Sequence, residues 1–198
     1  VLWKSDGTTN GTTTLAPGLY VGPPPDLVGS TPYSYRYITA VGGTAFFAGT
    51  TTDKGTELWK SDGTSLGTGL VKDIVTGGTN GVPYNSYPYD ITTFGRGVLV
   101  FGFGDKGAEL WKSDGSETGT VLVKTIVNSA YEWAYPNGST VVGHQMFFAA
   151  TDSRAGRELW KTDGTSRGTV LVADLNTATA YGYPESSDPS QLTAVGGS

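Results

Sequence analysis

The sequence of 198 residues contains no cysteine, a single histidine and a single methionine. Without cysteine the chain can form no disulfide, no thiolate metal site and no cysteine nucleophile. The lone histidine, His144, has no second histidine or cysteine with which to bind zinc, so no metal site is expected there. No run of about 18 apolar residues is present, which argues against a transmembrane helix. A long helical apolar period is also missing, which disfavours an α-helical fold.

Positive charge is scarce as well. Lys and Arg number 13 against 18 Asp and Glu, giving a net charge of −5. Nucleic-acid binding requires clustered Lys and Arg, so nucleic acid is not an expected partner. No residue is marked as a nucleophile for His144, and the arginines form no cluster that would hold a carboxylate substrate. We therefore expect no enzymatic activity and no cofactor.

Glycine and a repeated eight-residue motif dominate what is present. The chain contains 30 Gly and 10 Pro, a composition that favours strands and tight turns. The motif recurs at intervals of roughly 50 residues, as VLWKSDGT from Val1, ELWKSDGT from Glu57, ELWKSDGS from Glu109 and ELWKTDGT from Glu158. A catalytic centre is normally built once, so a motif present in four copies indicates a structural unit.

Each repeat reads as four short strands. The first is expected at 37–41, 90–94, 139–142 and 191–195, and the second at 44–49, 98–102 and 145–150. The ELWK residues form the third, and the fourth is expected at 69–75, 121–127 and 170–175. Asp-Gly between the third and fourth strands predicts a hairpin, because glycine readily adopts the positive φ that such turns need. The apolar strands show little alternation, which is typical of sheets covered on both faces.

These patterns predict an all-β fold, and specifically a β-propeller. About four blades of roughly 50 residues fit the repeat length. The repeats occupy approximately 1–37, 38–90, 91–138 and 139–191 of a single domain over 1–198, and 192–198 begin a further or closing blade. Either a four-bladed ring contains one incomplete blade, or the chain is a segment of a longer propeller or array. The second alternative is favoured, because residue 1 falls inside a third strand.

The motif also carries a family resemblance. ELWKSDGTSLGTGLVKDI (57–74) closely resembles the ELWxxDGT repeat, which occurs in tandem in large secreted bacterial proteins. The resemblance implies a secreted or cell-surface, propeller-like module, and it implies no reaction. The SDGTxxGT hairpin further resembles the Asp-box of sialidase propellers, in which an aspartate holds its own turn. By this analogy, backbone N–H groups would donate to Asp6, Asp62, Asp114 and Asp163.

The connectors between repeats carry the aromatic residues. In blades of this strand order, the connectors share one rim with the turns between second and third strands. All 11 tyrosines fall in connectors or, for Tyr37, where a connector joins the next expected strand, among Ser, Asn, Gly and Pro, a composition typical of adaptable binding loops. The alternative is that these rings cover the boundaries between blades. The candidate ligand-binding residues are Tyr33, Tyr35, Tyr84, Tyr87, Tyr89, Tyr131, Trp133, Tyr135, Tyr181 and Tyr183.

Carboxylate pairs recur in the turns between second and third strands. The pairs are Asp53 with Glu57, Asp105 with Glu109 and Asp152 with Glu158. Ca²⁺ requires six or more oxygen ligands, and the dense ligand series of known calcium loops is missing here. We favour solvated turns over calcium sites.

The sequence thus predicts a non-enzymatic extracellular binding module that recognises carbohydrate through its Tyr- and Trp-rich connectors. Its partner would be an extracellular glycan. The alternative is a structural or adhesive repeat module in which the same connectors bind a cell-surface protein or other copies of the chain.

Overall fold

Strands form all the regular secondary structure of the described residues, which confirms the predicted all-β class. The computed structural model describes residues 1–22, 38–126 and 136–195. β-branched and aromatic residues fill the strand interiors, and glycine occupies most of the turns that need positive φ.

Three antiparallel sheets carry four consecutive strands each, in the predicted order. The first sheet contains β4 (Ile38–Val41), β5 (Thr44–Thr51), β6 (Gly55–Ser61) and β7 (Gly69–Lys72), and β3 (Tyr20–Val21) also pairs with β5. The second contains β10 (Tyr89–Phe94), β11 (Gly97–Gly104), β12 (Gly107–Ser113) and β13 (Val121–Thr125). The third contains β14 (Asn137–Val142), β15 (Gln145–Asp152), β16 (Gly156–Thr162) and β17 (Val170–Ala173).

Three two-stranded pairs complete the fold. The N-terminal pair joins β1 (Leu2–Lys4) to β2 (Thr13–Ala16), the third and fourth strands of the first motif copy. Two further hairpins lie inside connectors, where the sequence predicts only loops. They are β8 (Gly78–Thr79) with β9 (Val82–Pro83), and β18 (Thr179–Ala180) with β19 (Tyr183–Pro184).

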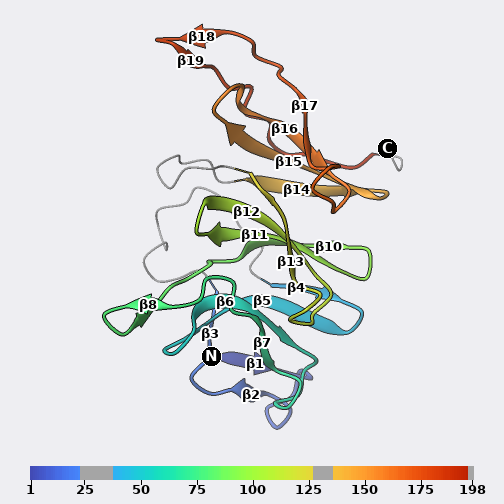
Figure 1. The fold of residues 1–198 in the computed structure, drawn as a ribbon. Coiled ribbons are helices and arrows are strands. Elements are labelled where there is room, and N and C mark those ends of the chain that lie inside the picture. Colours follow the sequence, from blue (N-terminus) through green and yellow to red (C-terminus); the bar gives the residue numbers. More distant parts are fainter. Residues whose placement is uncertain (23–37, 127–135, 196–198) are drawn as a thin grey trace.

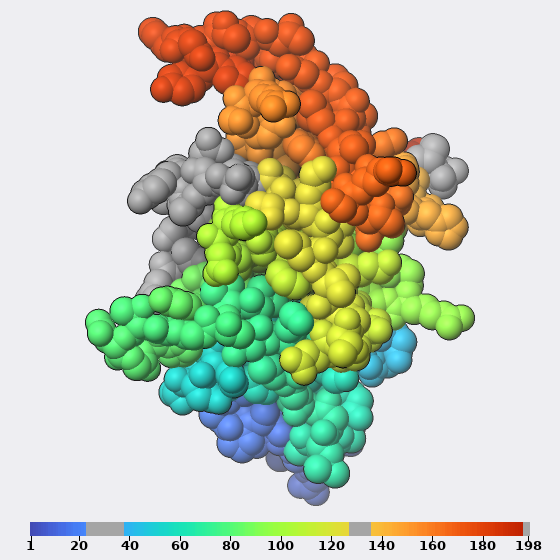
Figure 2. Space-filling view, viewed as in Figure 1, coloured from blue at the N-terminus to red at the C-terminus, as the bar shows by residue number. Residues whose placement is uncertain are grey.

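The sheets lie one upon another in chain order (Figure 1). The N-terminal pair lies at one end of this open stack and the third sheet at the other. The β8–β9 and β18–β19 hairpins project from the same side, on the left in Figures 1 and 2. The motif hairpins that follow β6, β12 and β16 lie on the opposite side. The two connectors that the structure describes in full, which contain β8–β9 and β18–β19, therefore share one rim, as the strand order predicts.

Face-to-face packing of the sheets forms the core. Val98 and Val100 of β11 pack with Phe46 and Leu58 of the first sheet, while the intervening residues of β11 face the third sheet. There the ring centroids of Phe101 and Phe148 lie 5.1 Å apart. Because β11 is buried on both faces, its sequence shows no polar alternation, which is the pattern expected for a doubly covered sheet.

Several predicted strand boundaries are wrong, among them the ends of all three fourth strands, which fall at Lys72, Thr125 and Ala173. The fourth strand of the first sheet ends at Lys72 and not at 75, because the Ile74 amide donates to the Glu57 side chain. Residues 191–195, predicted as a further first strand, form no strand. A strand requires a hydrogen-bonded neighbour, and no second strand follows this segment in the described residues. Its Leu192 carbonyl instead accepts a hydrogen bond from the Thr140 hydroxyl.

Phe101→Ala tests the packing between the second and third sheets. Phe101 is fully buried, so its truncation should lower the free energy of unfolding by about 3–5 kcal/mol. Urea unfolding measures this loss. Leu66→Ala is the control, because Leu66 is fully exposed in a motif hairpin and its removal should cost less than about 0.5 kcal/mol. Equal effects of the two variants would contradict the packing described.

Candidate functional site

The aspartate of each motif holds its own hairpin, as the Asp-box resemblance implies. Asp62 Oδ1 accepts hydrogen bonds from the Thr64 amide at 2.8 Å and the Thr64 hydroxyl at 2.7 Å. Asp6, Asp114 and Asp163 accept the corresponding bonds. The Thr64 hydroxyl and amide lower the pKa of Asp62. A Cβ atom on Gly67 would lie 2.1 Å from Asp62 Cγ, which explains the second glycine of the motif.

The lysine of the motif connects one repeat to the next. Lys4 Nζ donates to the Gly63 carbonyl at 3.0 Å, and Lys60 Nζ donates to the Gly115 carbonyl at 2.7 Å. In each case the acceptor is the carbonyl of the glycine in the SDG turn of the next repeat. The motif lysine is thus a contact between neighbouring motif hairpins, repeated along the stack.

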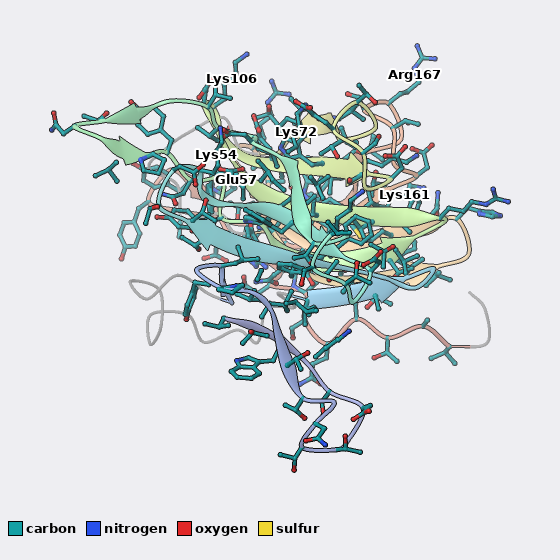
Figure 3. The ribbon with its side chains drawn as sticks, turned by 90° about the horizontal axis from the view of Figure 1, so that it is seen from below. Lys54, Glu57, Lys72, Lys106, Lys161 and Arg167 are labelled. Atoms are coloured by element: carbon teal, nitrogen blue, oxygen red, sulfur yellow. The ribbon has the colours of Figure 1, made fainter. Side chains whose placement is uncertain are left out.

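The glutamate of the motif holds the connector that follows. Glu57 in β6 is fully buried, and its carboxylate accepts the Ile74 amide at 2.9 Å, the Ser86 amide at 2.9 Å and the Ser86 hydroxyl at 2.6 Å. Figure 3 shows Glu57 within the fold, whereas Lys106 and Arg167 point outward. Ile74 and Ser86 flank the β8–β9 hairpin, so one carboxylate holds both ends of this projection.

The third sheet repeats this arrangement. Glu158 in β16 accepts the Leu175 amide at 3.0 Å, the Ser187 amide at 2.7 Å and the Ser187 hydroxyl at 2.5 Å. Leu175 and Ser187 flank the β18–β19 hairpin. In the second sheet, Glu109 accepts Trp111 Nε1 at 3.1 Å, and most of the connector that follows lies outside the described residues.

The two equivalent glutamates have opposite pKa shifts. Burial raises the pKa of Glu57 to about 7 and outweighs its hydrogen bonds from Ser86 and Ile74. Burial also acts to raise the pKa of Glu158, but the hydrogen bonds from Ser187 and Leu175 together outweigh it, so this pKa is lowered. The difference follows from position, because the first sheet lies inside the stack and the third lies at its end.

A groove opens between the β8–β9 hairpin and the turn of the next sheet. It has a volume of about 550 Å³, and Thr79, Tyr84, Asn85 and Asp105 are among its lining residues. The Tyr84 side chain is 45% exposed, and its hydroxyl lies 2.8 Å from the Thr79 hydroxyl. Asn85 Oδ1 accepts the Thr56 amide at 2.7 Å, which fixes this side chain at the groove. We call this space the Tyr84 groove.

The structure separates the predicted aromatic residues into distinct environments. Tyr84 lines the groove, whereas Tyr87 is half-buried and is not among its lining residues. Tyr181 and Tyr183 are exposed on the β18–β19 hairpin. Tyr33, Tyr35, Tyr131, Trp133 and Tyr135 lie outside the described residues.

Tyr89 differs from its predicted role, because it is buried in the core and its ring centroid lies 5.9 Å from that of Phe101. Tyr89 belongs to the core cluster that also contains Phe148 of the third sheet, so it packs between sheets. Surface exposure keeps Tyr84, Tyr181 and Tyr183 as binding candidates.

Sequence reasoning missed the hairpins that shape this rim. Asn80 and Gly81 have φ values of 54° and 80°, as the two central residues of a type I′ turn require. Asn-Gly in the connector was the available signal. Tyr20, which lies outside the predicted candidates, is exposed near the same rim.

The glutamates of the carboxylate pairs are not solvated as predicted, because Glu57, Glu109 and Glu158 are buried. The Glu57 carboxylate accepts hydrogen bonds from its connector, for example from the Ile74 amide. Lys54 Nζ of the adjoining turn lies 3.2 Å from Asp73 Oδ2 and forms an ion pair with it. Within the described parts of the chain, no group of three or more His, Cys, Asp or Glu side chains could hold a metal ion. Across the same residues, no helix is long and apolar enough to cross a membrane.

Comparison with protein-family models, with curated proteins and with solved structures finds no match to this chain. The resemblance to the ELWxxDGT repeat therefore rests on the motif residues, and a functional inference rests on the geometry of the connector rim.

The opposite pKa shifts of Glu57 and Glu158 predict opposite effects of pH on stability. The Glu57 carboxyl binds its proton more tightly in the folded state, so its contribution to stability falls as pH rises from about 4.5 to 7. The total change is about 3 kcal/mol at most. Glu57→Gln should remove this fall, as measured by urea unfolding between pH 4 and 8.

Glu158→Gln is the matched variant. The lowered pKa of Glu158 gives stability that is lost as pH falls through its folded value. This substitution should therefore flatten a slope of the opposite sign. Identical pH profiles of the two variants would contradict the assignment.

Proposed function

We propose that the protein is a non-enzymatic, secreted or cell-surface binding module of propeller type that takes an uncharged carbohydrate in the Tyr84 groove. The observation that carries this proposal is the groove itself. An exposed tyrosine ring, oriented through its hydroxyl by Thr79, faces a space that Asn85 and Asp105 also line. An aromatic face with a few positioned polar groups is a common form of small-molecule site.

The groove chemistry favours an uncharged sugar. Among the described residues, Asp105 is the only charged one that lines the Tyr84 groove, and a carboxylate accepts hydrogen bonds from hydroxyl groups while repelling anions. Asn85 adds an amide beside the Tyr84 ring. A neutral glycan satisfies both features, whereas a uronic or sialic acid would place like charges together.

Contacts between repeats support a propeller-type arrangement. The Thr39 hydroxyl of β4 donates to the Ile91 carbonyl of β10, and the Ser139 amide of β14 donates to Asp90 Oδ2 of β10. First strands of successive repeats thus lie side by side, as the inner strands of adjacent blades do. The ELWxxDGT resemblance supports the extracellular location.

A binding role is also consistent with how the carboxylates of the repeated motif are used. Asp62 and its equivalents hold their own turns, and Glu57 and Glu158 hold connectors. These groups serve the scaffold, and the variation between repeats lies at the hairpin tips.

The β18–β19 hairpin favours a second candidate function, adhesion through protein contacts. Tyr181 is fully exposed at the hairpin tip with φ 53°, a conformation that tyrosine rarely adopts, and Tyr183 is 74% exposed. Exposed aromatic side chains grouped on a projection are typical of interaction surfaces.

Tyr84 variants test the proposed carbohydrate site. On an array of neutral and acidic glycans, the protein should bind neutral glycans, and Tyr84→Ala should lower that binding at least tenfold by removing the ring. Tyr84→Phe keeps the ring and should retain most of the binding. Leu66→Ala, on the opposite rim, is the control. Binding of no neutral glycan, or unchanged binding by Tyr84→Ala, would contradict the proposal.

Light scattering after size-exclusion chromatography tests the adhesive candidate. If the β18–β19 hairpin mediates contacts between copies, the apparent mass should rise with protein concentration. The double variant Tyr181→Ser, Tyr183→Ser should abolish the rise, because it removes both exposed rings. A monomer at every concentration would count against self-association.

A further inference from the structure

The β8–β9 hairpin has a second groove on its other side. This space has a volume of about 460 Å³, and its lining includes Tyr20, Thr51 and Thr52 together with Val82, Pro83 and Asn85. The last three residues also line the Tyr84 groove. The hairpin is therefore a wall common to both spaces, which we distinguish as the Tyr84 groove and the Tyr20 groove.

The Tyr20 groove is built by ordered parts of the fold. Tyr20 in β3 pairs with Thr50 of β5, and the adjacent Leu19 is buried. This anchoring leaves the Tyr20 side chain 42% exposed, close to the exposure of Tyr84. Each groove thus contains one half-exposed tyrosine supported by a strand or hairpin, with small polar or apolar residues beside it.

Charge is low in both grooves. Within the described ranges of the chain, no Lys or Arg lines either space, and Asp105 is the one charged lining residue of the two. Anionic polymers would find no cationic partner there. Threonine hydroxyls and the Asn85 amide provide neutral hydrogen-bonding groups suited to hydroxyl-rich chains.

We propose that the two grooves are subsites of one site that takes an extended, uncharged polysaccharide chain across the β8–β9 hairpin. This inference rests on the proposed carbohydrate function and adds chain length and a second subsite to it. A ligand that reaches both tyrosines gains the second contact intramolecularly, so affinity should rise steeply with chain length.

Isothermal titration with defined oligosaccharides tests this inference. The probes are β-1,4-gluco-, β-1,3-gluco- and β-1,4-manno-oligosaccharides of two and six units. For at least one series, the hexasaccharide should bind the protein at least tenfold more tightly than the disaccharide. Tyr20→Ala should remove most of this length advantage, while Tyr20→Phe should retain it.

Thr52→Arg is an independent variant, because Thr52 is exposed at the turn and lines the Tyr20 groove. A bulky side chain there should also remove the length advantage without disturbing β3. Equal affinity of short and long probes, or a length advantage that persists in both Tyr20→Ala and Thr52→Arg, would overturn the two-subsite inference and leave the Tyr84 site intact. Binding of no neutral glycan on the array or of no probe here would overturn the proposed function itself.

Discussion

A buried carboxylate that holds the following connector is the contact on which the rim of this protein depends. Glu57 accepts the amides of Ile74 and Ser86, which stand on either side of the β8–β9 hairpin. Burying a carboxylate is costly unless it is hydrogen-bonded, and the three donors offset part of that cost, since burial still raises the pKa of Glu57 to about 7. The same contact at Glu158 shows that it belongs to the repeat and not to one position.

The repeated motif divides its polar residues among three structural tasks. The aspartate holds its own turn, the lysine contacts the next motif hairpin, and the glutamate holds the next connector. The residues that differ between repeats lie at the tips of the connector hairpins, outside these three contacts. The turn of β8–β9 contains Asn80 and that of β18–β19 contains Tyr181. A constant scaffold with variable projections is the arrangement expected of a binding protein whose specificity resides in its loops.

Part of this organisation could be predicted from the sequence. Asp-Gly pairs and continuous apolar runs located the three sheets and their strand order, because turn chemistry and double-sided burial act locally. The role of Glu57 could not be predicted, since a charged residue in a strand ordinarily indicates an exposed position and its partners are remote in sequence. Tyr89 illustrates the same limit, because composition groups it with Tyr84 whereas packing against Phe101 places it in the core.

Amide hydrogen exchange of Ile74 and Leu175 tests the central contact most directly. Each amide donates to a motif glutamate, Ile74 to Glu57 and Leu175 to Glu158. If these carboxylates hold the connectors, both amides should exchange slowly, at rates close to those of amides within β6 and β16. Exchange as fast as that of the exposed Leu66 amide would contradict the account, because the connectors would then be held by something else.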